Sequence, residues 1–117
     1  MLDVYFHVCP VCGNVILSTG KAEVTCCGKK VPSLRADDGQ GMRIDMTEDE
    51  YLIDTGHPMT KDHYFSFFAA VSDLDVQFAK LFPGGRACAR FRREGVEAIY
   101  MYCTVHGLYV RRMREAD

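Results

Sequence analysis

The sequence lacks a long apolar run, a strong excess of one charge and a leader-like start. Its most apolar stretch, Phe65–Val71, is far too short to span a bilayer. The formal net charge of −2 gives no general attraction to nucleic acid or to anionic membranes, so we expect neither as a partner. The N-terminal residues show neither the basic region nor the apolar core of a signal peptide, so we expect a cytoplasmic protein.

A long helical period is also missing, and so is an internal repeat. Short apolar or alternating runs instead follow one another between turns, which predicts strands. The expected strands cover residues 4–8, 15–17, 23–25, 42–46, 51–53, 64–71, 76–82, 87–92, 96–103 and 108–113. Strands at this spacing favour a mainly β chain that contains an antiparallel β-sandwich of immunoglobulin-like build.

A polar, glycine-bearing segment, residues 37–41, interrupts the pattern. A chain of 117 residues holds one domain or two very small ones. We therefore expect a small metal-binding module in residues 1–36 and the sandwich in residues 37–117. About 36 residues bury too little apolar surface to fold unaided, so a tetrahedral metal is expected to hold the module together.

Four of the six cysteines form two pairs, Cys9 with Cys12 and Cys26 with Cys27. In a cytoplasmic chain, cysteines indicate metal or redox chemistry more than disulfides. Four thiolates form a closed tetrahedral shell that suits zinc and a single iron equally well. A structural zinc ribbon is one interpretation. The adjacent cysteines Cys26 and Cys27 would distort such a site, because neighbouring side chains point apart on extended backbone. Cys88 matches no motif and is expected to be a buried free thiol.

Three histidines and a further cysteine form a second candidate set. His57 and His63 are six positions apart, which would separate the rings by about 20 Å on one strand. A proline after His57 favours a loop that turns both rings inward. Cys103 and His106 converge only if a strand ends at Cys103 and the chain turns, which Gly107 permits. Three imidazoles and one sulfur suit iron, zinc or copper rather than calcium or magnesium.

The motif His-Pro-Met with a second histidine, followed much later by Cys-x2-His-Gly, resembles the iron-binding domain of superoxide reductases, the desulfoferrodoxin and neelaredoxin family. The N-terminal Cys-Pro-Val-Cys-Gly-Asn and Cys-Cys-Gly segments resemble the desulforedoxin module that precedes this domain in desulfoferrodoxins. The resemblance covers nearly the whole chain in the same order. It implies the immunoglobulin-like fold, a homodimer paired through the module, and iron at the four cysteines. The N–H groups of Gly13 and Gly28 are expected to bond to sulfur there.

By this resemblance, His57, His63, Cys103 and His106 correspond to ligands of the family's ferrous centre. That centre normally has four histidines, one axial cysteine thiolate and an open position where superoxide binds. The family's Glu-Lys-His-x-Pro segment, which supplies the remaining histidine and a lysine that attracts superoxide, is missing or heavily shortened here. The resemblance therefore implies an iron centre that lacks one of the usual histidine ligands.

The sequence offers several ways to fill that position. The fourth histidine, His7, precedes the first cysteine motif and is expected to be a surface residue on a strand. Asp45, Glu48 or water are candidates for the vacant ligand position, or the centre has four ligands only. Lys61 is the nearest basic residue that would attract an anion.

The resemblance implies one-electron reduction of superoxide to hydrogen peroxide, with the four-cysteine iron as an electron relay and a small redox protein such as a rubredoxin as donor. Two alternatives stay open. The first is a rubredoxin-like electron-transfer protein whose second site is vestigial. The second is a structural zinc-binding module.

Overall fold

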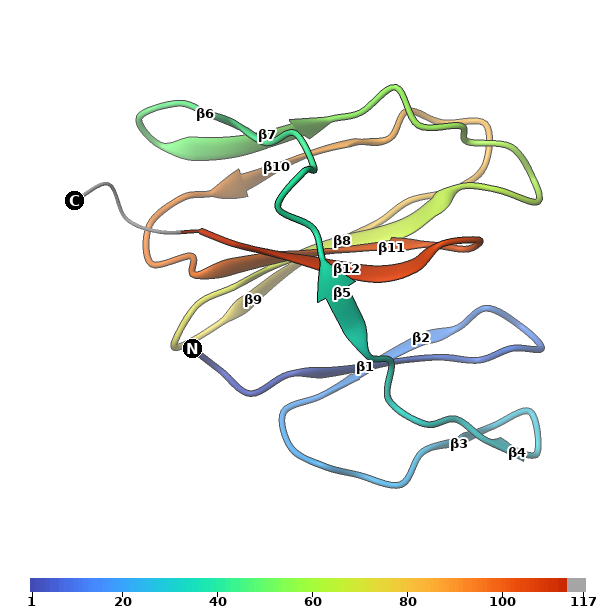
Figure 1. Cartoon of the computed structure of the whole chain (residues 1–117). Coiled ribbons are helices and arrows are strands. Elements are labelled where there is room, and N and C mark those ends of the chain that lie inside the picture. The colour runs from blue at the N-terminus through green and yellow to red at the C-terminus, as the bar shows by residue number, and fades with distance from the viewer. Residues whose placement is uncertain (114–117) are drawn as a thin grey trace. The chain divides into compact units, whose positions relative to one another are not determined.

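The computed structural model describes residues 1–113 and divides the chain into two compact units. The smaller unit is formed by residues 2–35, and the larger one contains Met1 and the chain from Ala36 onward. All regular elements in the described residues are strands, which confirms the prediction of a mainly β chain (Figure 1). Within the described residues, no helix has the length and apolar character needed to cross a membrane.

Two short antiparallel hairpins build the smaller unit. The first pairs β1 (Tyr5–Val8) with β2 (Val15–Ser18), and the second pairs β3 (Thr25–Cys26) with β4 (Lys29–Lys30). Backbone bonds from Val31 to Val24 and from Leu34 to Phe6 connect the later chain to these hairpins. Cys9 and Cys12 lie in the loop of the first hairpin, whereas Cys26 ends β3 and Cys27 is in the turn of the second, so strand pairing constrains the backbone at both pairs.

His7 is buried within this unit, with only 1% of its surface exposed, so the expectation of a surface histidine is wrong. Its ring Nδ1 donates to the carbonyl of Val31 over 2.9 Å, and its Nε2 lies 3.3 Å from the hydroxyl of Ser18. A neutral ring satisfies both contacts, because the hydroxyl then donates to Nε2. The small unit therefore uses His7 as a hydrogen-bonded core residue that ties β1 to the segment after β4.

Two facing sheets build the larger unit (Figure 1). The five-stranded sheet has the order β5-β12-β11-β8-β9, and the three-stranded sheet has the order β10-β7-β6. The strands of the first are β5 (Ala36–Asp38), β8 (Phe65–Val71), β9 (Val76–Lys80), β11 (Ala98–Cys103) and β12 (Gly107–Arg112). Those of the second are β6 (Asp45–Met46), β7 (Glu50–Asp54) and β10 (Cys88–Arg92). All pairs are antiparallel except β12 with β5, which is parallel.

The core of this unit lies between the two sheets. Phe65, Phe68 and Met101 of the larger sheet belong to one buried cluster with Ile53 and Phe91 of the smaller sheet. β8 is buried along its whole length, which agrees with its continuous apolar sequence. The cluster also contains Cys103, so the apolar core extends to the end of β11 where the second candidate site begins.

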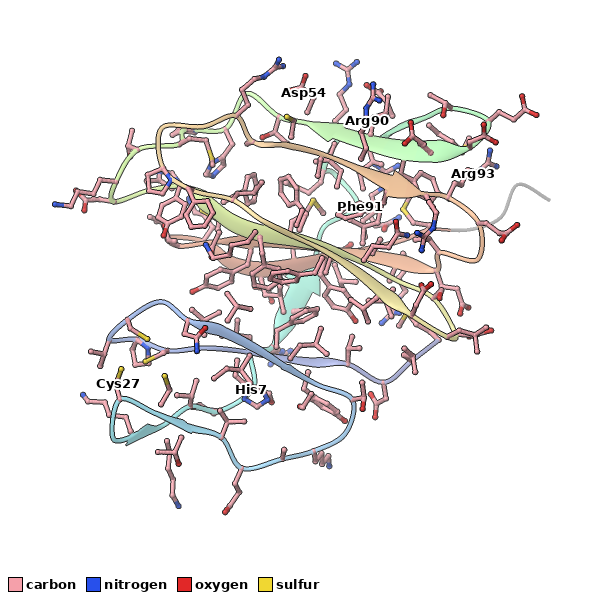
Figure 2. All side chains as sticks on the ribbon, turned by 180° about the vertical axis from the view of Figure 1, so that it is seen from behind. His7, Cys27, Asp54, Arg90, Phe91 and Arg93 are labelled. Carbon is pink, nitrogen blue, oxygen red and sulfur yellow. The ribbon has the colours of Figure 1, made fainter. Side chains whose placement is uncertain are left out.

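Cys88 is exposed, so the expectation of a buried thiol is wrong. It begins β10 on the face that also carries Arg90, whereas Phe91 points into the core (Figure 2). In a strand of period two, a shift of one residue exchanges the inner and outer faces. The weakly alternating sequence around Cys88 did not distinguish the two registers.

β5 crosses to the edge of the large sheet and leads into a loop that is pressed against β12. The N–H of Gly39 donates to the carbonyl of Val110 over 2.8 Å. A Cβ atom on Gly39 would lie 3.1 Å from the Cβ of Tyr109 and 3.2 Å from the Val110 oxygen. Such distances are tighter than most contacts of a Cβ atom, so a side chain at this position would push the loop and β12 apart by a few tenths of an ångström.

We expect Gly39→Ala to lower the free energy of unfolding by about 1–3 kcal/mol, because the loop and the backbone of β12 must shift to make room for the new methyl group. Gly41→Ala is the matched control, since nothing lies within 4 Å of a Cβ atom at that position. Chemical denaturation of both variants measures the difference. Equal midpoints for the two variants would show that the loop moves freely away from β12.

Candidate metal centres

Cys9 and Cys12 lie in the loop that joins β1 to β2. The N–H of Cys9 donates to the carbonyl of Asn14 over 3.0 Å, and that of Gly13 donates to the carbonyl of Cys9 over 2.9 Å. Gly13 thus bonds to oxygen, contrary to the expectation that it bonds to sulfur. The N–H of Val11 lies 3.4 Å from the sulfur of Cys9, and the N–H of Cys12 also bonds to this sulfur. Such donors stabilise a thiolate.

Cys26 and Cys27 stand at the tip of the second hairpin. Cys26 faces Lys29 across the hairpin, so Cys27 and Gly28 are its two loop residues. Their φ angles are 53° and 73°, and positive φ at both loop residues is the requirement of a type I′ turn. The left-handed backbone at Cys27 removes the geometric difficulty expected for adjacent cysteines, because the side chains no longer alternate as on extended backbone.

The two loops bring the four cysteines of the smaller unit together (Figure 2). The sulfur of Cys26 lies 3.7 Å from that of Cys12 and 4.0 Å from that of Cys27. All four sulfur atoms lie within 4.8 Å of one another. A tetrahedral ion with metal–sulfur bonds of about 2.3 Å separates its ligands by about 3.8 Å, so the four sulfurs fit a zinc or iron ion.

The thiols of this cluster differ in acidity. Backbone N–H groups of Cys12 and Val11 lower the pKa of Cys9 to about 6. Hydrogen bonds with Cys12 and Cys9 raise the pKa of Cys27 to about 12 and also raise the pKa of Cys26. The thiolate of Cys9 is therefore favoured at neutral pH before metal arrives, and a bound ion must displace protons from Cys26 and Cys27.

His57 and His63 lie in the loop between β7 and β8. Hydrogen bonds in both directions between Thr60 and His63, of 3.0 and 3.2 Å, close a turn in this loop. The turn brings the two ring centroids to 4.6 Å. The Nδ1 of His57 donates to the carbonyl of Pro58 over 2.7 Å, which leaves its Nε2 unprotonated in the neutral ring. The loop therefore presents a ligand-ready nitrogen.

His63 supplies the clearest sign that a partner belongs in this site. Its Nε2 is buried and has no hydrogen-bond partner among the described residues. Buried polar atoms are almost always paired, so an unpaired one requires an explanation. Burial, followed by the neighbouring His57 and His106, lowers the pKa of His63. A lowered pKa favours the neutral ring that a metal ion needs.

Cys103 ends β11, and His106 lies in the turn that leads to β12. Gly107 has a φ of 95°, a left-handed conformation that closes this turn and pairs with Cys103. The sulfur of Cys103 lies 3.3 Å from Nε2 of His57 and 3.4 Å from Nδ1 of His106. These distances lie between the separations of about 3.1 Å and 3.6 Å that adjacent nitrogen and sulfur ligands have in octahedral and tetrahedral sites.

The donor atoms of these four residues lie within 4.8 Å of one another. Among residues 1–113, no aspartate or glutamate joins the cluster. Asp45 and Glu48, two residues considered for the vacant position, lie elsewhere: Asp45 is ion-paired with Arg43, and Glu48 is in the exposed turn after β6. Lys61 is exposed in the loop before His63, and its role in attracting an anion stays a prediction.

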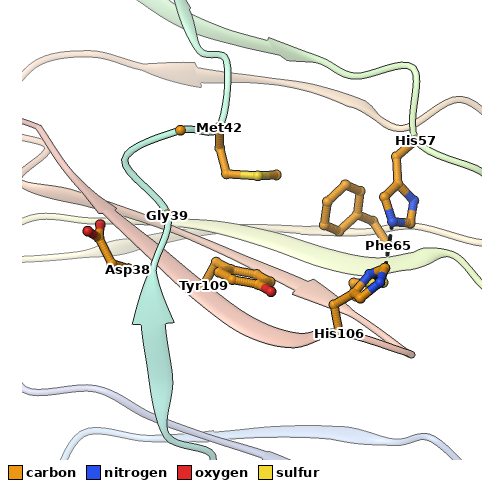
Figure 3. A pocket seen from close by; sticks show the side chains of 9 residues that line it. Asp38, Gly39, Met42, His57, Phe65, His106 and Tyr109 are labelled. Atoms are coloured by element: carbon orange, nitrogen blue, oxygen red, sulfur yellow. Dashed lines mark hydrogen bonds between the residues drawn. The ribbon is translucent and has the colours of Figure 1, made fainter.

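An open pocket of about 350 Å³ adjoins the cluster (Figure 3). The walls beyond the donor residues include Met42, Phe65 and Tyr109, none of which was expected to contribute to the site. Phe65 is only two positions after His63, so its contact with the site could have been predicted from the sequence. Met42 and Tyr109 meet here through the parallel pairing of β5 with β12, which has no local sequence signal.

No model of a known protein family matches the sequence. A desulfoferrodoxin of Syntrophotalea carbinolica is 28% identical over 92% of this chain and 94% of its own length. A desulfoferrodoxin of Clostridium acetobutylicum is 34% identical over 45% of this chain and 42% of its own length. The superoxide reductase of Treponema pallidum superposes with a TM-score of 0.79 at 17% identity, covering 94% of this chain and 98% of that one, which shows a shared fold.

We expect zinc affinity of the four-cysteine cluster to rise with pH across the neutral range, because protons on Cys26 and Cys27 compete with the ion. Each displaced proton contributes about a tenfold gain in affinity per pH unit. Competition with a chromophoric chelator at several pH values measures this slope. Cys27→Ser removes the least acidic thiol, so the slope should fall by about one proton. An affinity that is independent of pH would contradict the assigned protonation states.

Proposed function

Because this chain belongs to the desulfoferrodoxin and superoxide reductase family, we propose that it reduces superoxide to hydrogen peroxide at a ferrous centre. The convergence of His57, His63, Cys103 and His106 beside an open pocket is the observation that supports this reaction most directly. The overall change consumes one superoxide, one electron and two protons for each hydrogen peroxide formed.

When bound, ferrous iron would supply the single electron and attract the anion. The protein's part is to hold the ligands and protect the centre. The carbonyl of Pro58 orients the ring of His57, and the burial of Cys103, which is 1% exposed, keeps its thiolate away from water. A thiolate raises electron density at the iron, as in thiolate-ligated haem. We assign the attraction of superoxide to Lys61, since it adjoins the ligand loop and is exposed.

We assign the four-cysteine cluster to electron transfer. Iron in four thiolates changes oxidation state without changing its ligands, so it suits a relay. Cys12 and Cys27 are exposed, which gives a redox donor direct access to the edge of the cluster. A small redox protein such as a rubredoxin is the proposed donor, and a homodimer in the cytoplasm is the proposed state.

A rubredoxin-like electron-transfer protein is the second candidate. It is favoured by the donor count, because His57, His63, Cys103 and His106 supply only four ligand atoms in the described residues. In that case the four-cysteine iron does all the work and the second site is vestigial. A structural zinc module is the third candidate, and the metal content separates it from the other two.

Pulsed superoxide should oxidise the ferrous protein near the diffusion limit, about 10⁹ M⁻¹ s⁻¹. We expect Cys103→Ser to slow this step at least about a hundredfold, equivalent to roughly 2.7 kcal/mol, because the electron-donating thiolate is lost. Cys88→Ser is the control, since Cys88 is exposed on β10 and belongs to neither cluster. A wild-type rate no faster than that of free ferrous ion would exclude the enzymatic reaction and favour the second candidate.

Protein produced without added metals should contain about two iron atoms per chain, one for each donor cluster. The double variant His57→Ala, His63→Ala should retain one iron and the reducible colour of the four-cysteine site. Elemental analysis and absorption spectra measure both. Zinc in both sites of the wild-type protein would support the structural module instead.

A further inference from the structure

The pocket beside the His/Cys cluster is larger than superoxide requires. Its volume of about 350 Å³ is roughly ten times the 30 Å³ that one water occupies in the liquid. It also lies at the lower end of the range for small-molecule sites, about 300–1,000 Å³. A molecule of two atoms would leave most of this space to water, so the pocket fits a larger ligand.

The pocket directly borders the donor atoms. His57, Cys103 and His106 line it, whereas His63 is not among its lining residues. It therefore opens on a side of the cluster that His63 does not cover. Non-haem iron sites with few protein ligands keep positions for external ligands, and this cluster supplies four protein donor atoms within the described residues. A ligand in the pocket has access to one of the remaining positions.

The walls favour a flat, apolar ligand. The ring of Phe65 stands 4.1 Å from that of His57, and Met42 packs against the same buried cluster as Phe65 and Cys103. Figure 3 shows the side chain of Met42 extending toward Phe65 and His57 on one side of the pocket, and the ring of Tyr109 on the other. Aromatic rings and a methionine thioether pack well against a heterocycle.

The lining of the pocket contributes no positive side chain among the described residues. Asp38 is the one formally charged residue among the described residues that line the pocket, and it carries a negative charge. Its carboxylate accepts the N–H of Gln40 over 3.0 Å at the rim. Neither lysine nor arginine lines this pocket. The lining therefore adds nothing to the attraction that a bound metal ion exerts on an anion, and the apolar walls favour a neutral ring.

Met42 is held in place as a wall. Its N–H donates to the carbonyl of Gly39 over 2.9 Å, and its carbonyl accepts a hydrogen bond from the guanidinium of Arg111 on β12. The close approach of Gly39 to Tyr109 and Val110 fixes the start of the same loop. One backbone hydrogen bond, one side-chain hydrogen bond and the close approach of Gly39 to β12 thus keep the pocket from collapsing onto the cluster.

We propose that this pocket is a second ligand site of the His/Cys centre, which takes a small neutral nitrogen heterocycle of the imidazole class. One ring nitrogen binds the metal, the ring packs between Met42 and Tyr109, and the distal N–H faces the hydroxyl of Tyr109. Metal-bound imidazoles commonly donate their second N–H to such a partner. The inference rests on metal occupancy of the cluster in the proposed function, and it does not depend on superoxide turnover.

The test uses the full chain loaded with Co²⁺, whose visible absorption reports the number of ligands, and imidazole as the probe at pH 8, where imidazole is neutral. Sodium azide is the anionic comparison. We expect a saturable spectral change with one imidazole per His/Cys site, and at least tenfold weaker binding of azide, which is too small to pack between Met42 and Tyr109. No spectral change with imidazole, or equal affinity for both probes, would overturn the proposal.

Met42→Trp should fill the pocket and weaken imidazole binding at least tenfold while the cobalt content stays the same. Met46→Trp is the matched control, because Met46 is 56% exposed on β6 and does not line the pocket.

Tyr109→Phe keeps the pocket and removes one hydroxyl, so it should weaken imidazole binding several-fold even if the tryptophan variant fails to fold. If both Tyr109→Phe and Met42→Trp bind imidazole with unchanged affinity, imidazole binds elsewhere. If Met42→Trp does not fold, unchanged affinity in Tyr109→Phe alone leads to the same conclusion. Superoxide is absent from these titrations, so their failure is distinguishable from a failure of the proposed reaction.

Discussion

Two hydrogen bonds between Tyr64 and Thr104 hold the two halves of the His/Cys cluster together. The N–H of Thr104 donates to the carbonyl of Tyr64 over 3.0 Å, and the N–H of Tyr64 donates to the hydroxyl of Thr104 over 3.2 Å. One partner directly follows His63 and the other directly follows Cys103, although 40 positions separate them in the chain. The link extends the pairing of β8 with β11, in which Cys103 faces Phe65, into the two ligand loops, so it helps to fix the ligands relative to one another.

The two clusters prepare their ligands by different physical means. In the smaller unit, backbone N–H groups stabilise the thiolate of Cys9, and the left-handed turn at Cys27 sets the sulfur positions. In the larger unit, burial keeps His63 neutral and leaves its Nε2 without a hydrogen-bond partner. The first arrangement is closed and suits electron exchange through exposed cysteines. The second supplies four donor atoms beside an open pocket and suits the binding of a small molecule.

The absence of a further histidine ligand changes what the second centre offers. Its place is taken neither by Asp45 nor by Glu48, and His7 uses both ring nitrogens inside its own unit. The cluster instead borders an apolar pocket whose loop is held by Arg111.

The sequence by itself determined the strand content and the spacing of donors around the cysteine turns and the histidine loop, because turn chemistry and alternation act over a few residues. Two of the wrong predictions, for Cys88 and for His7, share one cause. The exposure of Cys88 and the burial of His7 depend on which face of a short strand meets the core, and a shift of one residue reverses that choice. Only the tertiary structure decided that Met42 and Tyr109 wall the pocket, since the parallel pairing of β5 with β12 joins segments about 70 residues apart. Contacts of that kind depend on how whole sheets pack, so they cannot be predicted from a local pattern of residues.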